Sequence, residues 1–346
     1  LLLDFNTARE SEPHAPLPQA SGYPGGLRRA QAHLNRAVES HLKNFGSKPK
    51  GMWPSEGSLS RATLKLLGEH GCRWTATGQA VLAHSLQRES NGAPLPDKGS
   101  YLYKPYVLED AGKPVYCFFR DDQLSDRIGF EYAKWKGDDA AADFVHQLEE
   151  IHRNAQGEHD PVVSVILDGE NAWEYYPYNG YYFLSELYAK LEKHPFIATT
   201  TFGEMAEGLQ GSNERIDQGR LKQLVAGSWV YGTFSTWIGS PDKNRGWDLL
   251  CEAKRSFDIV ANSGRLNAEE LRLATEQLAD CEGSDWFWWF GDYNSAQSVS
   301  SFDALYRKNL SNLYRLLKLA PPVDLQHVIS VGGGSPAAGG TMRRSE

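Results

Sequence analysis

The chain has 346 residues, which is enough for one large domain or two of ordinary size. Acidic residues outnumber basic ones by 44 to 36, and this balance argues against a nucleic-acid-binding protein, which normally carries a basic face. Hydrophobic residues make up 40% and charged residues 23%, so the composition excludes a wholly disordered chain. No apolar run approaches the roughly 20 residues that a membrane helix needs.

Strand and helix patterns alternate from about residue 27 to residue 200. Apolar residues at helical spacing predict helices at residues 27–45, 59–67, 144–151 and 183–191. For the second of these, Ser58 is the expected N-cap. Short apolar runs predict strands at residues 51–53, at 74–83 together with an exit loop, and at 115–119. The alternation indicates an α/β fold, either a barrel or a doubly wound sheet.

The clearest predicted strand covers residues 162–167. Its β-branched residues run without alternation, as expected for a parallel strand that is covered on both faces. Beyond residue 215 the pattern becomes helical, with helices expected around residues 247–257, 267–278 and 302–317. Asn267 and Glu270 have the spacing of a capping box at the start of the second of these helices.

The cysteines and the two ends of the chain bear on its environment. Four scattered cysteines have neither metal-site spacing nor the density of a disulfide framework. No basic segment precedes the leucines at the start, unlike in a signal peptide, so we favour a cytoplasmic location. The glycine-rich end predicts a flexible tail over residues 328–346.

Two carboxylates follow predicted strands and are the candidates for catalysis. Glu56 follows the strand at 51–53 and precedes a helix, whose positive end favours an ionised carboxylate. Asp168 directly follows the strand at 162–167, and tryptophan and tyrosine residues crowd the next fifteen positions. An α/β barrel gathers functional groups at the carboxyl ends of its strands, and glycoside hydrolysis needs two carboxylates in different environments.

Taken together, the motifs resemble glycoside hydrolase family 57, in its amylopullulanase-like branch. The segment GMWPSEGS at residues 51–58 is similar to that branch's nucleophile motif, and LDGENAWE at 167–174 is similar to its acid/base motif. Further segments of the same pattern are FFRDDQLSD at 118–126, TWIG at 236–239 with Lys243-Asn244, and SDWFWWFGD at 284–292. The resemblance extends over about residues 20–322.

This resemblance implies a fold, a reaction and a set of residues. The fold is a distorted seven-stranded (β/α) barrel, of which residues 1–210 form the C-terminal part, followed by a helical bundle over residues 215–322. The reaction is a retaining cleavage of α-glucans, with Glu56 as nucleophile and Asp168 as acid/base, facing one cleft. Neither a metal nor another cofactor is expected. Eight further residues are expected to contact sugar: Trp53, Asp121, Asp122, Glu170, Trp173, Trp237, Trp288 and Trp289.

Several of these residues also have structural interpretations. Asp121 and Asp122, at the end of the strand at 115–119, bind sugar hydroxyls, steady Asp168, or form a solvated turn. Trp237, Trp288 and Trp289 either stack on glucose rings or fill the core of the bundle. The family's opening strand carries a His-Gln-Pro motif that this sequence lacks, so we expect the chain to enter the barrel before its fourth strand and to be a poor catalyst.

Three alternatives to an α-glucan hydrolase remain. A 4-α-glucanotransferase or branching enzyme uses the same residues and differs in excluding water. A non-catalytic glucan-binding remnant fits the missing barrel strands. A metal-dependent polysaccharide deacetylase needs an aspartate with a histidine pair, and no His-x-x-x-His pair occurs. The expected partner is an α-glucan in every case but the last, with no nucleic acid and no membrane.

Overall fold

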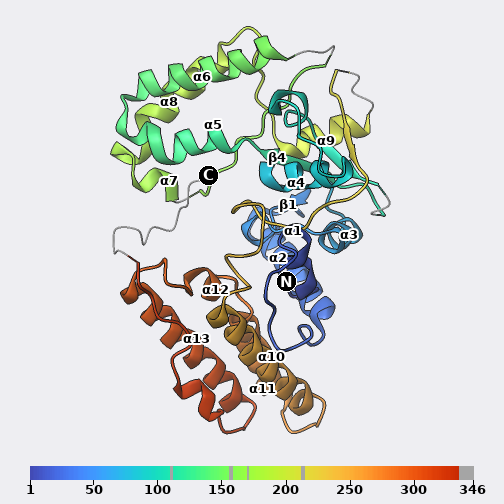
Figure 1. Ribbon diagram of the computed structural model, residues 1–346, viewed down its shortest axis with the longest axis vertical. Helices are drawn as coiled ribbons and strands as arrows, with labels where there is room; N and C mark the ends of the chain where they lie inside the picture. The colour runs from blue at the N-terminus through green and yellow to red at the C-terminus, as the bar shows by residue number, and fades with distance from the viewer. Residues whose placement is uncertain (110–111, 156–158, 170, 212–214, 335–346) are drawn as a thin grey trace. The chain divides into compact units, whose positions relative to one another are not determined.

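We analysed a computed structural model that describes residues 1–109, 112–155, 159–169, 171–211 and 215–334 (Figure 1). The chain divides into two compact units. Residues 45–233 form one of them, which we call the sheet unit. Residues 1–44 with residues 234–334 form the other, the helical unit. Residues 1–44 therefore group with the helical unit. The boundaries predicted from the sequence had instead placed them with the barrel segment over residues 1–210.

A five-stranded mixed sheet lies at the centre of the sheet unit, in the order β1-β2-β4-β3-β5. Three strands are parallel: β1 (Gly51–Met52), β2 (Trp74–Gly78) and β4 (Tyr116–Arg120). The strand β3 (Tyr106–Leu108) runs antiparallel to β4 and parallel to β5 (Gly219–Leu221). The strand at Gly51–Met52 and the strands near residues 74 and 116 agree with the sequence prediction, and the α/β class is confirmed.

The segment at residues 162–167, predicted as the clearest strand, has no regular ladder. Only Ser164 forms a parallel bridge, with Arg120 at the end of β4. The strand β3 already pairs with β4 at Tyr116 and Cys117, so only the far end of β4 is open to this segment. The predicted burial on two faces nevertheless holds, because the odd-numbered apolar residues pack in one hydrophobic cluster and Val162 and Ile166 in another.

Helices cover the sheet and extend beyond it. Their bounds are α3 (Arg61–Glu69), α4 (Gln79–Glu89), α5 (Asp122–Asp126), α6 (Gly137–Asn154), α7 (Asn171–Glu174), α8 (Tyr181–Glu192) and α9 (Phe202–Gln210). The N-cap of α3 is Ser60, whose hydroxyl accepts from the backbone N–H of Thr63, and not the predicted Ser58. Residues 79–83, predicted as part of an exit loop, instead begin α4, and sequence patterns did not predict α5 or α9.

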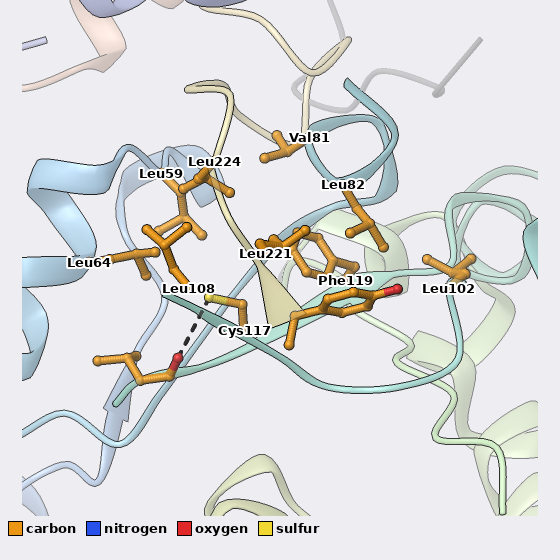
Figure 2. Packing of buried hydrophobic residues seen from close by; sticks show 12 residues of the cluster. Leu59, Leu64, Val81, Leu82, Leu102, Leu108, Cys117, Phe119, Leu221 and Leu224 are labelled. Carbon is orange, nitrogen blue, oxygen red and sulfur yellow. Dashed lines mark hydrogen bonds between the residues drawn. The ribbon is translucent and has the colours of Figure 1, made fainter. Parts of the chain in front are cut away.

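Several apolar clusters of the described residues stabilise the sheet unit, and the two with the most buried side chains are called here its first and second cores. Leucines from α3, α4 and the loops before β3 and after β5 converge with Phe119 of β4 in the first core (Figure 2). The second core joins α6 and α8, which lie side by side in Figure 1, through Phe144, Tyr132 and Phe183. Each fully buried side chain of this size contributes on the order of 1.5–3 kcal/mol through removal of apolar surface from water.

The helical unit contains α1 (Ala8–Ser11), α2 (Gly26–Phe45), α10 (Pro241–Ala261), α11 (Ala268–Cys281), α12 (Asp285–Trp289) and α13 (Ala296–Leu316). Figure 1 shows α10, α11 and α13 alongside one another, which confirms the predicted bundle. The capping box at Asn267 and Glu270 is present as predicted. No helix of the described ranges is both long and apolar enough to cross a membrane.

Specific polar contacts attach both ends of the chain to the bundle. Tyr23 and Arg29 donate hydrogen bonds to the buried carboxylate of Glu282. Near the other end, the backbone N–H of Gly334 donates to the carbonyl of Asn294, and Ser330 is buried. Residues 328–334 are therefore attached to the bundle rather than part of a flexible tail, and residues 335–346 lie outside the described ranges.

Candidate functional site

The two predicted catalytic carboxylates come from parallel segments of the sheet unit. Glu56 lies four residues past β1, and Asp168 lies four residues past Ser164, which bridges to the end of β4 in parallel. Since β1, β2 and β4 are mutually parallel, their carboxyl ends meet at one edge of the sheet. The topology thus brings both carboxylates to the edge at which α/β folds hold their ligands.

Glu56 sits in a strained backbone conformation. It lies in the 3₁₀ turn Ser55–Gly57, and its φ of 53° is in the left-handed region. A residue with a Cβ atom pays roughly 1–2 kcal/mol for this conformation. The next residue, Gly57, also has a positive φ, and its carbonyl accepts a hydrogen bond from the hydroxyl of Thr77 in β2. Such strain persists where surrounding contacts fix it, and it concentrates at functional sites.

The indole of Trp229 holds the Glu56 carboxylate. Its Nε1–H donates to Oε2 of Glu56 at 2.9 Å, and its backbone N–H donates to the Glu56 carbonyl at 3.3 Å. Trp53 packs edge-to-face on the same indole, with ring centroids 5.2 Å apart. A Cβ atom on Gly78, at the end of β2, would lie 2.7 Å from the Trp229 Cα, so the close approach of this loop requires glycine.

Arg120, the last residue of β4, connects three parts of this edge. Its guanidinium carbon lies 5.3 Å from the centre of the Trp229 ring, within range of a cation–π interaction. Its Nε donates to the carbonyl of Ile166, two residues before Asp168, at 2.9 Å. Its two terminal nitrogens donate to Asp122 at 2.8 Å and to Asp126 at 2.7 Å. One buried cation therefore contacts the indole that binds Glu56 and the segment that carries Asp168.

Asp122, which accepts a hydrogen bond from Arg120, has a perturbed protonation equilibrium. Burial raises the pKa of Asp122 to about 6, although the Arg120 guanidinium opposes the change. The neighbouring carboxylates Asp126 and Asp121 raise the pKa further. Burial and the neighbouring carboxylates thus outweigh the guanidinium at Asp122, and a carboxyl pKa raised in this way is common at functional sites.

Asp121, predicted as a sugar contact or a solvated turn, is fully buried. Its carboxylate accepts from the backbone N–H of Leu124 as the N-cap of α5, and from the hydroxyl of Tyr103 at 2.8 Å. Lys98 donates to both of its oxygens at 3.2 and 3.3 Å. These contacts contradict the solvated turn and favour a structural role, because the carboxylate is occupied by protein donors.

The structure describes Asp168 and Trp173 among the site residues predicted in this segment. Asp168 itself is half-buried. Trp173 packs among the rings of the second core, 5.4 Å from Tyr176 and 6.4 Å from Phe183, so its ring is mainly structural. Glu170 lies outside the described residues.

The three tryptophans predicted in the helical half lie within the helical unit. Trp237 and Trp288 are 3% and 8% exposed, with ring centroids 6.0 Å apart. Trp289 stacks on Phe302 at 4.7 Å with nearly parallel planes. These contacts favour the alternative that the rings fill the bundle core, and their contact with sugar stays a prediction.

Neither Trp229 nor Arg120 was predicted as a site residue. Trp229 lies about 170 residues from Glu56 in a stretch without periodic pattern, and nothing local marks its indole as a partner of a carboxylate. Arg120 lies in the segment FFRDDQLSD at residues 118–126, and its position at the end of an apolar strand is a usable signal. Within the described ranges, no group of three or more His, Cys, Asp and Glu side chains is placed to hold a metal ion.

The sequence model described as glycosyl hydrolase family 57 matches residues 13–218. A search of curated proteins found no match.

Three solved structures share the fold at low sequence identity. A branching enzyme of this family from Thermococcus kodakaraensis is 16% identical, with a TM-score of 0.67 over 83% of this chain and 62% of that one. An α-amylase from Thermotoga maritima is 17% identical, with a TM-score of 0.61 over 83% and 63%. A 4-α-glucanotransferase from Thermococcus litoralis is 16% identical, with a TM-score of 0.53 over 81% and 44%. The chain thus spans less than two thirds of the length of these structures.

Proposed function

Because the chain belongs to glycosyl hydrolase family 57, we propose that it cleaves α-glucans as a retaining glycoside hydrolase of the amylase and amylopullulanase type. The observation that carries this proposal is the pair of carboxylates at one edge of the sheet, with Glu56 strained and bound by an indole donor. The amylopullulanase-like assignment rests on the motifs at residues 51–58 and 167–174.

Glu56 is the nucleophile in the proposed reaction. Its carboxylate attacks the anomeric carbon of the bound glucose unit while Asp168 donates a proton to the departing glycosidic oxygen. The product is a covalent glycosyl–enzyme ester and a shortened glucan. Asp168, now ionised, takes a proton from an attacking water, which releases the sugar with its original anomeric configuration and frees Glu56.

Trp229 and Arg120 prepare the two carboxylates for these steps. The indole N–H fixes the orientation of the Glu56 carboxylate through Oε2. Arg120 holds the carbonyl of Ile166, and so restricts the segment that ends at Asp168. Holding reacting groups in position can supply several kcal/mol of barrier reduction.

The test is the release of reducing sugar from soluble starch and from pullulan by the wild type, Glu56→Gln and Asp168→Asn. We expect each substitution to lower turnover about 10²–10⁴-fold, which is the usual contribution of an acid/base group. Circular dichroism should show unchanged folding. Full activity in either variant on both substrates would contradict the assignment of that residue.

The same assay separates hydrolase from transferase. A 4-α-glucanotransferase or a branching enzyme redistributes chain lengths or adds branch points, and generates little new reducing sugar. Chromatography of the products with maltoheptaose as substrate distinguishes these outcomes. Binding of starch without any change of chain length would support the non-catalytic alternative.

A further inference from the structure

Exposed tyrosines gather on the surface where the second core reaches solvent. Tyr178, Tyr181 and Tyr182 are between 57% and 78% exposed. Their rings contact one another edge-to-face, with centroids 5.5 Å apart for Tyr178 and Tyr182 and 5.4 Å for Tyr181 and Tyr182. Single exposed aromatic residues are ordinary, but a contiguous set at a protein surface commonly marks a binding site. We call these three residues the tyrosine face.

The backbone under this face is strained. Tyr178 and Asn179 both have φ of 53°, and Gly180 follows with φ of 78°. Left-handed geometry is rare for a bulky aromatic residue, and here two successive residues with side chains adopt it. The conformation turns Tyr178 outward, to 78% exposure. Strain of this kind points to a function when the surrounding structure holds it in place.

Buried rings beneath the tyrosine face provide that support. A Cβ atom on Gly180 would lie 2.8 Å from the Trp173 ring, so this turn requires glycine. Tyr176 is buried and donates from its hydroxyl to the carbonyl of Ile128 at 2.6 Å. Tyr176 and Phe183 pack with centroids 5.6 Å apart. The exposed rings therefore stand on a fixed base, and little conformational entropy is lost when they bind a ligand.

The chemistry of the face selects a neutral, hydroxyl-rich ligand. Residues 175–182 contain no charged side chain, which disfavours an anionic membrane surface or a nucleic acid. Each tyrosine offers a flat apolar ring and a hydroxyl that both donates and accepts hydrogen bonds. A sugar ring presents the same combination, with an apolar C–H face and a rim of hydroxyl groups.

We propose that the tyrosine face is an accessory binding site for an α-glucan chain. This proposal rests on the proposed function, because it takes the same substrate class. The face begins ten residues after Asp168, and a polysaccharide is long enough to occupy both places. The site binds a distant part of the polymer and raises the local concentration of chain for cleavage.

Binding is tested in the full chain carrying Glu56→Gln, so that the polymer is not cleaved. Affinity electrophoresis in gels containing soluble starch compares this protein with a version that also carries Tyr178→Ala, Tyr181→Ala and Tyr182→Ala. We expect the dissociation constant for starch to rise about tenfold or more in the triple variant. A version with Tyr178→Phe, Tyr181→Phe and Tyr182→Phe should keep most of the affinity, because the rings remain.

Two controls make the result specific. Tyr188→Ala removes an exposed tyrosine two turns beyond Tyr181 on α8, and should change the dissociation constant less than twofold. Gels containing dextran, a neutral glucan with other linkages, should retard neither protein. Thermal unfolding should be the same for the triple alanine variant and its parent, since the removed rings are exposed.

The kinetic test uses the chain with an intact Glu56. The triple alanine variant should have a raised KM on soluble starch and unchanged kinetics on maltotriose. The proposal is overturned if the triple alanine variant binds starch as tightly as its parent. It is also overturned if the parent sediments as a dimer and the triple alanine variant as a monomer. Absence of any activity on α-glucans while starch affinity falls in the variant would instead contradict the proposed function alone.

Discussion

Two buried carboxyl groups, one in each unit, respond to a neighbouring arginine in opposite ways. Asp122 and Glu282 are both 7% exposed, and both bind an arginine at hydrogen-bond distance. Burial raises the pKa of Asp122 to about 6. Burial also acts to raise the pKa of Glu282, but hydrogen bonds from His33, Arg29 and Tyr23 outweigh it and hold the pKa below its usual range.

The number of donors accounts for the difference. Glu282 collects three side-chain partners onto one carboxylate, so its charge is stabilised inside the helical unit. Asp122 shares the single guanidinium of Arg120 with Asp126. The helical unit thus stabilises the charged form of its buried carboxylate, whereas in the sheet unit burial and the neighbouring carboxylates favour the protonated form of Asp122. A carboxyl pKa that departs upward through burial is the pattern expected near a functional site.

The largest expected effect is that of removing each arginine. Arg120→Ala leaves two buried carboxylates without their cation, and should destabilise the sheet unit by about 3–5 kcal/mol. Arg29→Ala leaves Glu282 with Tyr23 and His33, and should cost the helical unit less, about 1–3 kcal/mol. Hydrogen exchange read by mass spectrometry reports the two units separately. A larger loss of protection in Arg29→Ala than in Arg120→Ala would reverse the comparison.

The next effect is the pH dependence that Asp122 imposes on the sheet unit. The folded pKa of about 6 lies above the unfolded value of about 3.9, so the folded state holds the extra proton between these values. Stability contributed by this group is therefore present below pH 4 and is lost as pH rises to 6, by about 2–3 kcal/mol. Asp122→Asn cannot ionise, and should remove this slope from hydrogen exchange measured between pH 4 and 7. An identical slope in the variant would show that Asp122 is ionised throughout.

Glu282 should give the opposite sign in the helical unit. Its pKa is depressed, so the stability it contributes is present above pH 4.5 and is lost as pH falls through the lower folded value. Glu282→Gln should destabilise the helical unit at pH 7 by about 2 kcal/mol and flatten its acid response. Glu276→Gln in α11, the helix that Glu282 caps, is the control, because its half-exposed side chain pairs at the surface with Arg272. Equal effects of the two substitutions would contradict the role assigned to the Glu282 cluster.

Local pattern was sufficient to predict most of the elements that carry the site. The run at Gly51–Met52, the strand ending at Arg120 and the capping box at Asn267 are each marked by neighbours in the sequence. The α/β class follows from the alternation of predicted strands and helices. Hydrophobic periodicity and helix caps depend on neighbouring residues, so the sequence alone records them. The motif at residues 51–58 likewise predicts Glu56 as the nucleophile without any knowledge of the fold, and that role stays a prediction.

Pairings across long distances could not be predicted. The segment at 162–167 has the composition of a buried strand, but β3 occupies the start of β4, so only Ser164 pairs. The sequence left Asp121 open between a sugar contact, a support for Asp168 and a solvated turn, and only the approach of Lys98 and Tyr103 makes it a buried cap. The bond from Trp229 to Glu56 depends on how a loop near residue 229 crosses Gly78. Such contacts are set by tertiary packing, which composition and periodicity do not record.

The smallest expected effect tests whether Trp229 serves Glu56 or only fills space. Trp229→Phe keeps an aromatic ring beside Trp53 and Arg120 and removes the N–H that binds Oε2 of Glu56. Under the proposed function, kcat/KM on soluble starch should fall about tenfold, equivalent to ~1.4 kcal/mol of lost transition-state stabilisation. Trp286→Phe is the matched control, because its indole also donates at 2.9 Å, to the carbonyl of Asp280 in the helical unit. Loss of the hydrogen bond from Trp286 to Asp280 should leave kcat/KM unchanged, because this bond lies in the helical unit, whose polar contacts contribute to stability. If both variants lost activity equally, the indole of Trp229 would be no more than a packing element, and the contrast between the two units would not extend to catalysis.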